Sequence, residues 1–281
     1  MSLPAVRFPD THAAADDGRR LRLLSCNILA GARVDRYRHY VTRGLRQVLP
    51  HADKQGHLDE LAGIIRQFDI VGLQESDAGS LRSGFLNQTR YLAEAAEMPY
   101  WSFQPNRRVA RMAASSNGLI SRPEPVAVYD HPLPGRIPGR GVLVARFGTG
   151  SDSLAVLIAH LSLGTQARAR QLAFIAELLE DFPHAVLMGD LNCDIRSHEA
   201  RSVLDKTRLQ IPESSAPTFP SWQPRRAIDH ILATEGIAVT KSWVLPEACS
   251  DHLPLAAEIR LPEGVAALSS ADPDASQAGH P

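Results

Sequence analysis

The sequence predicts an α/β domain in which two packed β-sheets are flanked by helices. Apolar runs of strand length outnumber segments with helical spacing, and helices separate the strands in only part of the chain. This pattern favours two packed sheets over one parallel sheet. The 20 Pro and 19 Gly residues are typical of a chain with many turns. Hydrophobic residues make up 44% of the 281 positions, which is enough for a substantial core.

The strands and helices can be placed from periodicity. Helical spacing of apolar residues predicts helices over 57–68 and 86–97, and a third helix that Thr165 caps and whose inner face is Leu172, Ile175, Leu178, Leu179 and Phe182. Two short strands within 118–129 are separated at Pro123 and Pro125, since proline interrupts a ladder. The other predicted strands are 21–29, 69–75, 141–147, 154–161, 184–192, 228–233, 237–245 and 253–261.

One domain over residues 21–261 suits this length and pattern. Residues 1–20 and 262–281 lack periodicity, so we expect a flexible N-terminal tail and a disordered C-terminal tail. The run 154–161 is too short to span a bilayer, and the first residues do not resemble a secretory signal. We expect a monomer in the cytoplasm, with peripheral membrane contact left open. The three cysteines do not resemble a disulfide framework.

Polar residues stand at or just beyond the ends of many predicted strands. In α/β folds, binding sites are built from residues at strand ends and the loops that follow them. Asp190 and Asn192 are two positions apart, so on a strand both would point to one side while Leu191 packs opposite. Each residue alone has a structural explanation as a turn residue or a solvated acid. Their recurrence favours a metal or phosphate site, and the residues in question are Asn27, Glu75, His160, Asp190 with Asn192, Asp229 with His230, and Asp251 with His252.

The order of these residues resembles the endonuclease/exonuclease/phosphatase superfamily of DNase I-like enzymes over about residues 21–261. The segments that carry the resemblance are SCNIL (25–29), DIVGLQE (69–75), NGLISR (117–122), IAHLSLG (158–164), MGDLNCD (188–194), AIDHILA (227–233) and SDHLPLAAEI (250–259). The resemblance implies a four-layer α/β sandwich with two mainly antiparallel sheets. It also implies hydrolysis of a phosphoester with Mg²⁺, which Mn²⁺ can replace.

The resemblance implies a role for each site residue. Asn27, Glu75 and Asp251 form the metal site, and the catalytic residues are His160, Asp190, Asn192, Asp229 and His252. Asp190 orients or deprotonates the attacking water, and Asn192 donates its amide to a phosphoryl oxygen. Asp229 orients His252 and favours its protonated form, whereas His230 points away and is structural. Cys26, Cys193 and Cys249 neighbour site residues, but we expect buried thiols because adjacent strand positions face opposite sides.

Two departures from the family pattern bear on the substrate. Abasic-site endonucleases of the superfamily have an acid where this chain has Leu29, and a Tyr is usual where it has His160. Both differences resemble the branch that contains DNase I, neutral sphingomyelinases and small phosphodiesterases. We therefore do not expect abasic-site repair. The segments 77–85 and 133–141 resemble those of small bacterial members similar to enzymes that act on lipid anchors and phospholipid head groups.

Substrate choice should depend on loops outside the shared core, at 31–53, 77–85, 100–112 and 133–141. The expected phosphate contacts are Asn117, Arg82 and Arg140, with Arg107 and Arg168 as further candidates, although solvated surface arginines explain each arginine equally well. We expect a phosphodiester that is lipid-derived or small. The net charge of −1 does not favour a polyanion, yet a nuclease that uses Trp101, Phe103 and Arg107–Arg108 remains the alternative. An inactive binding module is disfavoured because Glu75, Asp190, Asn192 and His252 are all present.

Overall fold

The computed structural model describes residues 18–31, 52–109, 113–135, 139–212, 215–265 and 268. Most of both predicted tails, and residues 32–51 of the Arg-rich segment, lie outside the described residues. Arg20, which was assigned to the N-terminal tail, is instead the first residue of a strand.

A six-stranded sheet forms one layer, in the order β10-β11-β1-β2-β4-β3. Its strands are β1 (Arg20–Asn27), β2 (Ile70–Asp77), β3 (Tyr100–Val109), β4 (Ala113–Ser121), β10 (Ala238–Val244) and β11 (Leu255–Arg260). The central pair β1/β2 is parallel, and the other neighbouring pairs are antiparallel. Because parallel strands need a crossover connection, α2 (Ala52–Ile65) lies between β1 and β2 in the chain.

A five-stranded sheet forms a second layer, in the order β5-β6-β7-β8-β9. Its strands are β5 (Ala127–Pro132), β6 (Gly141–Phe147), β7 (Leu154–His160), β8 (His184–Asp190) and β9 (Asp229–Ala233). Here β7/β8 is the parallel pair, connected through α4 (Thr165–Glu180), and the other pairs are antiparallel. Each sheet therefore has one parallel pair with a helical crossover among antiparallel neighbours.

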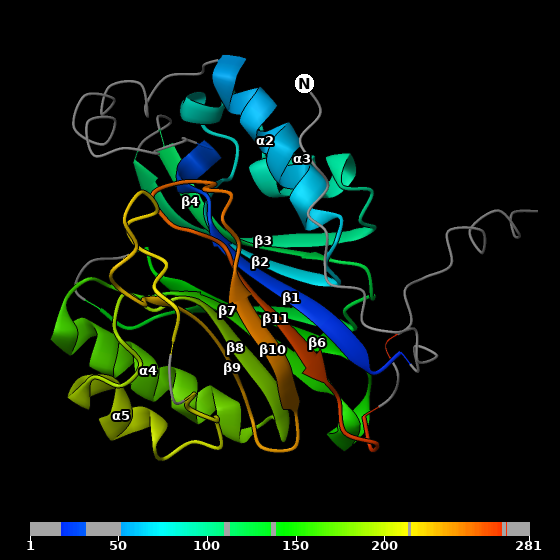
Figure 1. Cartoon of the computed structure of the whole chain (residues 1–281), viewed down its shortest axis with the longest axis vertical. Helices are drawn as coiled ribbons and strands as arrows, with labels where there is room; N and C mark the ends of the chain where they lie inside the picture. The colour runs from blue at the N-terminus through cyan, green and yellow to red at the C-terminus, as the bar shows by residue number, and fades with distance from the viewer. Residues whose placement is uncertain are drawn as a thin grey trace, which may run out of the picture.

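Helices cover the outer face of each sheet, which gives four layers (Figure 1). Between the sheets lies a core that includes Leu23 and Ile70 of one sheet and Ile158 and Met188 of the other. A second core joins the six-stranded sheet to α2 and α3 (Gln88–Ala95), and a third joins the five-stranded sheet to α4 and α5 (His198–Leu204). The predicted four-layer α/β sandwich with two mainly antiparallel sheets is confirmed. Within the described residues, no helix is both long and apolar enough to cross a membrane.

The sequence misplaced three local features. Residues 100–109, expected in a loop, form β3 at the edge of its sheet, where Pro105 is tolerated beside an irregularity in register. Thr165 does not cap α4, because the cap residue is Gly164 and no side chain completes the cap. The short helix α5 was not predicted; the Ser197 hydroxyl caps it by accepting the Ala200 N–H.

Candidate active site

Three neighbouring strands of the five-stranded sheet each carry a polar residue at one end, and these residues are aligned with one another across the strands. His160 at the end of β7 is paired with Asp190 at the end of β8, and Asp190 is paired with Asp229 at the start of β9. Cross-strand partners share one face of a sheet. Positions two residues away on these strands, Ile158, Met188 and Ile231, pack in the core between the sheets. The three polar side chains therefore point toward the six-stranded sheet.

A sharp turn after β8 fixes Asp190 and Asn192. A Cβ atom on Gly189 would lie 1.9 Å from the Ala159 carbonyl oxygen, so no other residue fits there without moving the backbone. Asn192 has φ 55°, a left-handed conformation that asparagine tolerates, and its N–H donates to Asp190 Oδ1 at 2.9 Å. Its side-chain amide donates to the Leu161 carbonyl oxygen at 2.9 Å. Contrary to the sequence analysis, this Asx-type turn, and not strand alternation, brings the two residues together.

The six-stranded sheet supplies Asn27 and Glu75 at the ends of its parallel pair. Asn27 Nδ2 donates to Asp190 Oδ2 at 3.2 Å, although the two residues are 163 positions apart in the sequence. Glu75 lies where the β2/β4 register shifts, with φ 56°, and its side chain is 27% exposed. Its Oε1 is 3.8 Å from His160 Nε2, which is 3.4 Å from Asp190 Oδ2. These contacts join the ends of four strands from both sheets into one site.

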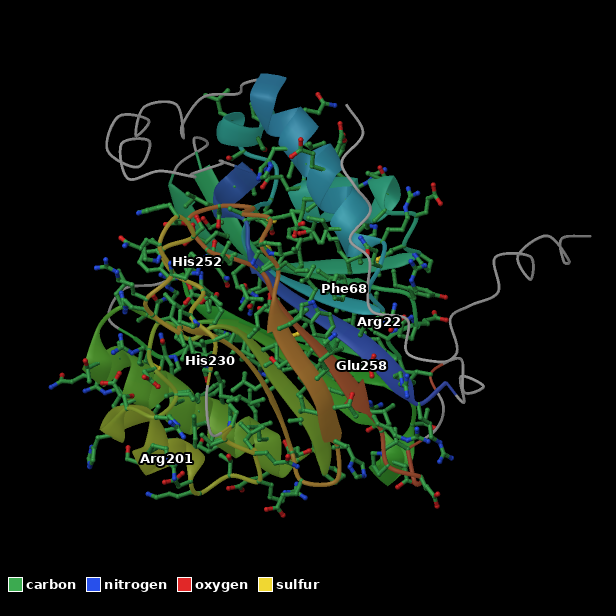
Figure 2. All side chains as sticks on the ribbon, in the orientation of Figure 1. Arg22, Phe68, Arg201, His230, His252 and Glu258 are labelled. Carbon is green, nitrogen blue, oxygen red and sulfur yellow. The ribbon has the colours of Figure 1, made fainter. Side chains whose placement is uncertain are left out.

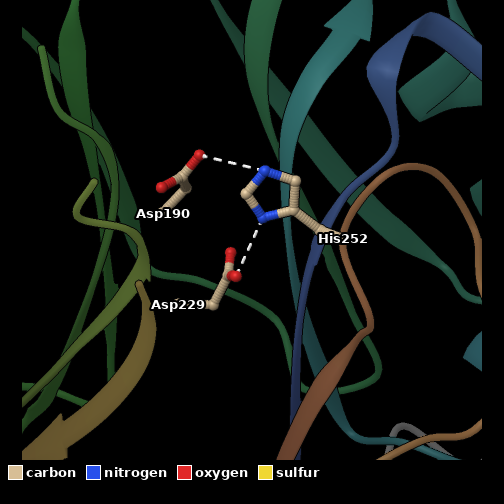
Figure 3. Close-up of side chains that lie close together, drawn as sticks. All are labelled: Asp190, Asp229 and His252. Carbon is tan, nitrogen blue, oxygen red and sulfur yellow. Dashed lines mark hydrogen bonds and ion pairs between the residues drawn. The ribbon is translucent and has the colours of Figure 1, made fainter. Parts of the chain in front are cut away.

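His252 completes the site from the segment that precedes β11. Its Nδ1 is 2.8 Å from Asp229 Oδ2, and its Nε2 is 3.8 Å from Asp190 Oδ2, so the imidazole lies between the two carboxylates (Figure 3). The Thr218 hydroxyl donates to the same Asp229 oxygen, and the Phe219 ring lies 4.9 Å from the imidazole ring between centroids. In the whole molecule, His252 lies near one end of the sheets and His230 lies well apart from it (Figure 2).

Asp251 is buried beside His252, and the backbone around it is tightly bonded. The Ser250 hydroxyl donates to the Asn27 carbonyl oxygen, and the Asp251 carbonyl oxygen accepts the Ser221 N–H at 2.7 Å. The 250–252 segment is thereby tied to the end of β1 and to the 218–221 segment. Sequence reasoning missed 218–221, because Thr218 and Phe219 carry no charge or metal-binding group and act only through contacts made by folding.

Burial and neighbouring charges shift the pKa values of the site residues. Burial lowers the pKa of His252, but the charge and hydrogen bond of Asp229, with Asp190 and Asp251, outweigh it and raise that pKa to about 10. Burial and the charge of Asp229 raise the pKa of Asp190 to about 7. Burial, Arg140 and His252 hold the pKa of His160 well below its usual value. His252 is therefore cationic at neutral pH, whereas His160 is a neutral imidazole.

The balance of charge at the site fits a bound cation. Burial raises the pKa of Asp251 as well as that of Asp190. Three buried carboxylates, Asp190, Asp229 and Asp251, surround the cationic His252, and the negative charge of each raises the pKa of that imidazole. Three buried carboxylates beside one cation are costly, and a hard divalent ion with oxygen ligands would offset their charge.

Asp190, Asp229 and His252 also form a group that could hold a metal ion, since their ligand atoms lie within 4.8 Å of one another. However, His252 already shares its Nδ1 with Asp229, and a protonated imidazole has no lone pair for a metal. The group is better described as a hydrogen-bonded acid–imidazole network. Asn27, Glu75 and Asp251 also carry oxygen atoms that an ion could bind, and Asn27 Oδ1 accepts the Leu29 N–H at 3.2 Å, which orients it.

Two of the residues considered as contacts of the substrate phosphate form hydrogen bonds within the protein instead. Asn117 is fully buried, and its amide nitrogen donates to Gln104 Oε1 and to the carbonyl oxygens of Gly141 and Ile158. These bonds tie β4 to the neighbouring sheet, so the expected phosphate contact of Asn117 is corrected to a supporting role. Arg168 is buried and bonds to Glu199 and to the Ser162 and Leu163 carbonyl oxygens. It supports the loop after β7 instead of facing a substrate.

The remaining arginines divide between the site and the undescribed parts of the chain. Arg140 lines a cavity of about 750 Å³ together with Glu75 and His160. The Arg82 backbone belongs to a 3-10 turn at Leu81–Ser83, but its side chain lies outside the described residues, as do those of Arg107 and Arg108.

The cysteines and His230 are structural. The pKa of the Cys26 thiol is held well above its usual value by a hydrogen bond with Cys249 and by burial, and burial raises that of Cys193 to about 11. Protonated thiols are poor metal ligands. His230 is buried and its Nε2 lies 2.9 Å from the Cys193 carbonyl oxygen, outside the acid–imidazole network.

The fold and the position of the site define a DNase I-like α/β sandwich with a polar cluster at the strand ends. The sequence pattern of the endonuclease/exonuclease/phosphatase family matches residues 24–252, and the chain belongs to this family. Members of the family hydrolyse phosphoester bonds and generally use divalent metal ions. No curated protein matches the chain.

Solved structures with the same fold have low sequence identity to this chain. An endonuclease/exonuclease/phosphatase from Beutenbergia cavernae is 22% identical, with a TM-score of 0.70, and the match covers 87% of this chain and 72% of that one. A mannosyl-6-phosphatase from Bacteroides thetaiotaomicron is 18% identical, with a TM-score of 0.62 and coverage of 85% and 99%. A humanized D. rerio TDP2 is 15% identical, with a TM-score of 0.62 and coverage of 86% and 99%. At these identities the likeness supports the fold alone.

Proposed function

We propose that this protein is a hydrolase that cleaves a phosphoester, in particular a phosphodiester, with Mg²⁺ and with Mn²⁺ as a substitute. The observation that carries the proposal is the convergence of Asn27, Glu75, His160 and Asp190 from four strands of two sheets. Groups so distant in sequence, with perturbed pKa values and an adjoining cavity, are typical of a catalytic site.

Asn27, Glu75 and Asp251 would hold the ion. All three offer oxygen atoms, which Mg²⁺ prefers, and the partly exposed Glu75 borders the cavity by which an ion and a substrate can enter. When bound, the ion would act as a Lewis acid toward the phosphoryl oxygens. The excess negative charge of the buried carboxylates supports this assignment, because a bound cation would neutralise it.

Asp190 is the residue best suited to act on the attacking water. Asn27 and the Asn192 N–H hold its two oxygens, so its orientation is fixed. Its pKa of about 7 matches that of a general base near neutral pH. Asn192 uses one amide hydrogen on Leu161, which leaves the second to donate to a phosphoryl oxygen.

His252 would stabilise the charge that develops in the transition state. Asp229 binds its Nδ1 and keeps the ring cationic, so its Nε2–H is left to donate a hydrogen bond or a proton. The neutral His160 has its Nε2 3.8 Å from Glu75 and 3.4 Å from Asp190, and one hydrogen on this nitrogen would orient the nearer carboxylate, that of Asp190. Arg140, and Arg82 as first suggested, would contact the substrate phosphate.

The position of the exposed aromatic residues favours a small or lipid-derived substrate over nucleic acid. Trp101 and Phe103 stack with ring centroids 6.2 Å apart. Trp101 is aligned with Ile120, which packs against the helices on the outer face of the sheet, whereas the site lies on the inner face. These rings therefore do not form a stacking platform for bases beside Asp190.

We propose that the protein acts as a monomer in the cytoplasm. The second candidate function is that of a nuclease.

Metal-dependent turnover of bis-p-nitrophenyl phosphate tests the proposal. Mg²⁺ or Mn²⁺ should support turnover and a chelator should remove it. Glu75→Gln should raise the metal concentration for half-maximal rate by at least about tenfold, because a charged ligand is lost. Glu177→Gln, an exposed change on α4, is the matched control and should behave as wild type.

No turnover with either ion would favour an inactive binding module, and turnover unaffected by the chelator would refute the metal site. The substrate is then assigned by comparing plasmid nicking, phospholipid head-group release and hydrolysis of phosphorylated sugars. Plasmid nicking as the fastest of these reactions would replace the preferred assignment by a nuclease.

A further inference from the structure

The cavity beside the site extends beyond the catalytic residues toward helix α4. Glu75 and His160 line one part of it, and Arg140, Arg170 and Thr165 also line it. Its volume of about 750 Å³ is within the range of pockets that bind small organic ligands. This is more space than an ion and one phosphoryl group need, so the cavity can also hold the organic part of a substrate.

The side chains that line this cavity give it a positive part. Glu75 is the acidic residue among the described lining residues, and the proposed ion would neutralise it. The permanent positive charges of the lining are the guanidinium groups of Arg140 and Arg170. Arg170 is therefore a second cationic group of the cavity, in addition to Arg140, which lies near the catalytic residues.

Arg170 differs from Arg168, its neighbour on the same helix. Arg168 is 7% exposed and its guanidinium is used by Glu199 and by main-chain carbonyl oxygens. Arg170 is exposed and makes no hydrogen bond or ion pair with the described residues. The first arginine holds the fold together, whereas the second lines the cavity with its charge available. A guanidinium is suited to bind a phosphate or carboxylate through two parallel hydrogen bonds.

We propose that Arg170 binds a second anionic group of the substrate, so that the substrate class is a small phosphoester that also carries a phosphate or a carboxylate. This inference rests on the proposed function, since it takes the scissile phosphoester to lie at Asp190. Leu163, which is 77% exposed and also lines the cavity, offers an apolar contact for the carbon chain between the two anionic groups. Arg170 thus selects among phosphoesters, while the residues at the strand ends carry out hydrolysis.

Calorimetric binding of stable phosphonates tests the proposal without turnover. Three ligand series with alkyl chains of increasing length are compared at saturating Mg²⁺: alkyl monophosphonates, α,ω-bisphosphonates and phosphonocarboxylates. For the wild type, at least one chain length of a doubly anionic ligand should bind about tenfold more tightly than the matched monophosphonate, which is about 1.4 kcal/mol. Arg170→Ala should reduce this ratio to near one.

Arg201→Ala is the control, since Arg201 is exposed on α5, pairs with Asp205 and lies well apart from His252 (Figure 2). It should keep the wild-type ratio. Equal affinities of mono- and dianionic ligands for the wild type, or an unchanged ratio in Arg170→Ala, would overturn the proposal. The bisphosphonate and phosphonocarboxylate series show which anionic group is preferred. Because binding is measured directly, loss of selectivity is distinguishable from loss of phosphoesterase activity.

Discussion

The two sheets contribute to the same site in different ways. In the five-stranded sheet, His160, Asp190 and Asp229 occupy aligned positions on three neighbouring strands and are buried. In the six-stranded sheet, Glu75 lies at an irregular register with a left-handed backbone and a side chain that is 27% exposed. Asp251 lies in a segment before β11 and not within a strand. One half of the site is built from regular pairing. In the other half Asn27 is regularly paired, whereas Glu75 and Asp251 depart from regular pairing.

This difference matches the chemistry proposed for each half. Regular pairing fixes Asp190 and Asp229 on either side of His252, and acid–base catalysis depends on such fixed geometry. An ion needs oxygen ligands but also needs access and room for water, which a bulged and partly exposed Glu75 provides. The proposed ion ligands should therefore tolerate change better than the aligned residues, and mutations can break or sharpen this comparison.

The largest effects should come from Asp190 of the aligned half and from His252, the imidazole that lies between Asp190 and Asp229. Asp190→Ala and His252→Ala should each slow turnover of bis-p-nitrophenyl phosphate at least a hundredfold at saturating Mg²⁺, as loss of a catalytic acid or base does. Steady-state kcat is the measurement. Asp205→Ala, an exposed acid next to α5, is the control and should keep the wild-type rate. If excess metal restored the kcat of Asp190→Ala, Asp190 would be a ligand of the ion. The two halves of the site would then not differ in the way described.

For Asp229→Asn we expect a smaller loss of kcat, of about tenfold to a hundredfold. The amide keeps the shape but removes the negative charge that raises the pKa of His252 to about 10. The pKa of His252 should then fall, and the alkaline limit of activity should move to lower pH because the cationic ring is lost earlier. NMR titration of the imidazole and a pH–rate profile measure both effects. An unchanged pKa of His252 would contradict the role given to Asp229.

The sequence predicted the regular half of the site better than the rest. Residues at strand ends, such as His160 and Asp190, can be placed because apolar runs identify the strands that carry them. The bulge at Glu75 and the αL turn at Asn192 leave no periodic signal, because each depends on tertiary contacts. The residues at these positions were found from their place after apolar runs and from the family pattern, while their backbone geometry was not predicted.

Supporting residues were the least predictable from the sequence. Asn117 and Arg168 have the same residue types as phosphate ligands, and only their partners show that they support the fold. Thr218 carries no signal at all, since its role depends on meeting Asp229 across 11 positions. Arg170 is the converse case, because only the shape of the cavity distinguishes it from a solvated arginine.

The stability of the metal-free protein should depend on pH through both halves. The folded-state pKa of Asp190, about 7, is raised above its value of 3.8, and that of His252, about 10, is raised above 6.5. Each group therefore stabilises the fold at low pH, and this contribution is lost between about pH 4 and 7 for Asp190 and between about pH 6.5 and 10 for His252.

Melting curves with a chelator should show a Tm that falls by several degrees from about pH 5 to 9. Mg²⁺ should restore Tm more at high pH, where the carboxylates are ionised. Asp190→Asn should reduce the decline of Tm between about pH 4 and 7 most. It should reduce the decline above pH 7 less, because Asp229 still raises the pKa of His252. A Tm in chelator that rises with pH in the wild type, with the same slope in Asp190→Asn, would show that Asp190 is not held protonated by burial.

The smallest effect should come from Thr218, which touches neither substrate nor ion. Its hydroxyl donates to the Asp229 oxygen that also binds His252, so it holds that carboxylate in place. Thr218→Val removes this hydrogen bond at similar volume and should lower kcat several-fold, with KM changed less, because one neutral hydrogen bond contributes about 1 kcal/mol. Thr218→Ser keeps the hydroxyl and should stay near the wild-type kcat. Equal losses of kcat in Thr218→Val and Thr218→Ser would show that packing, and not the orientation of Asp229, explains the effect. The segment 218–221 would then have no part in positioning the aligned half of the site.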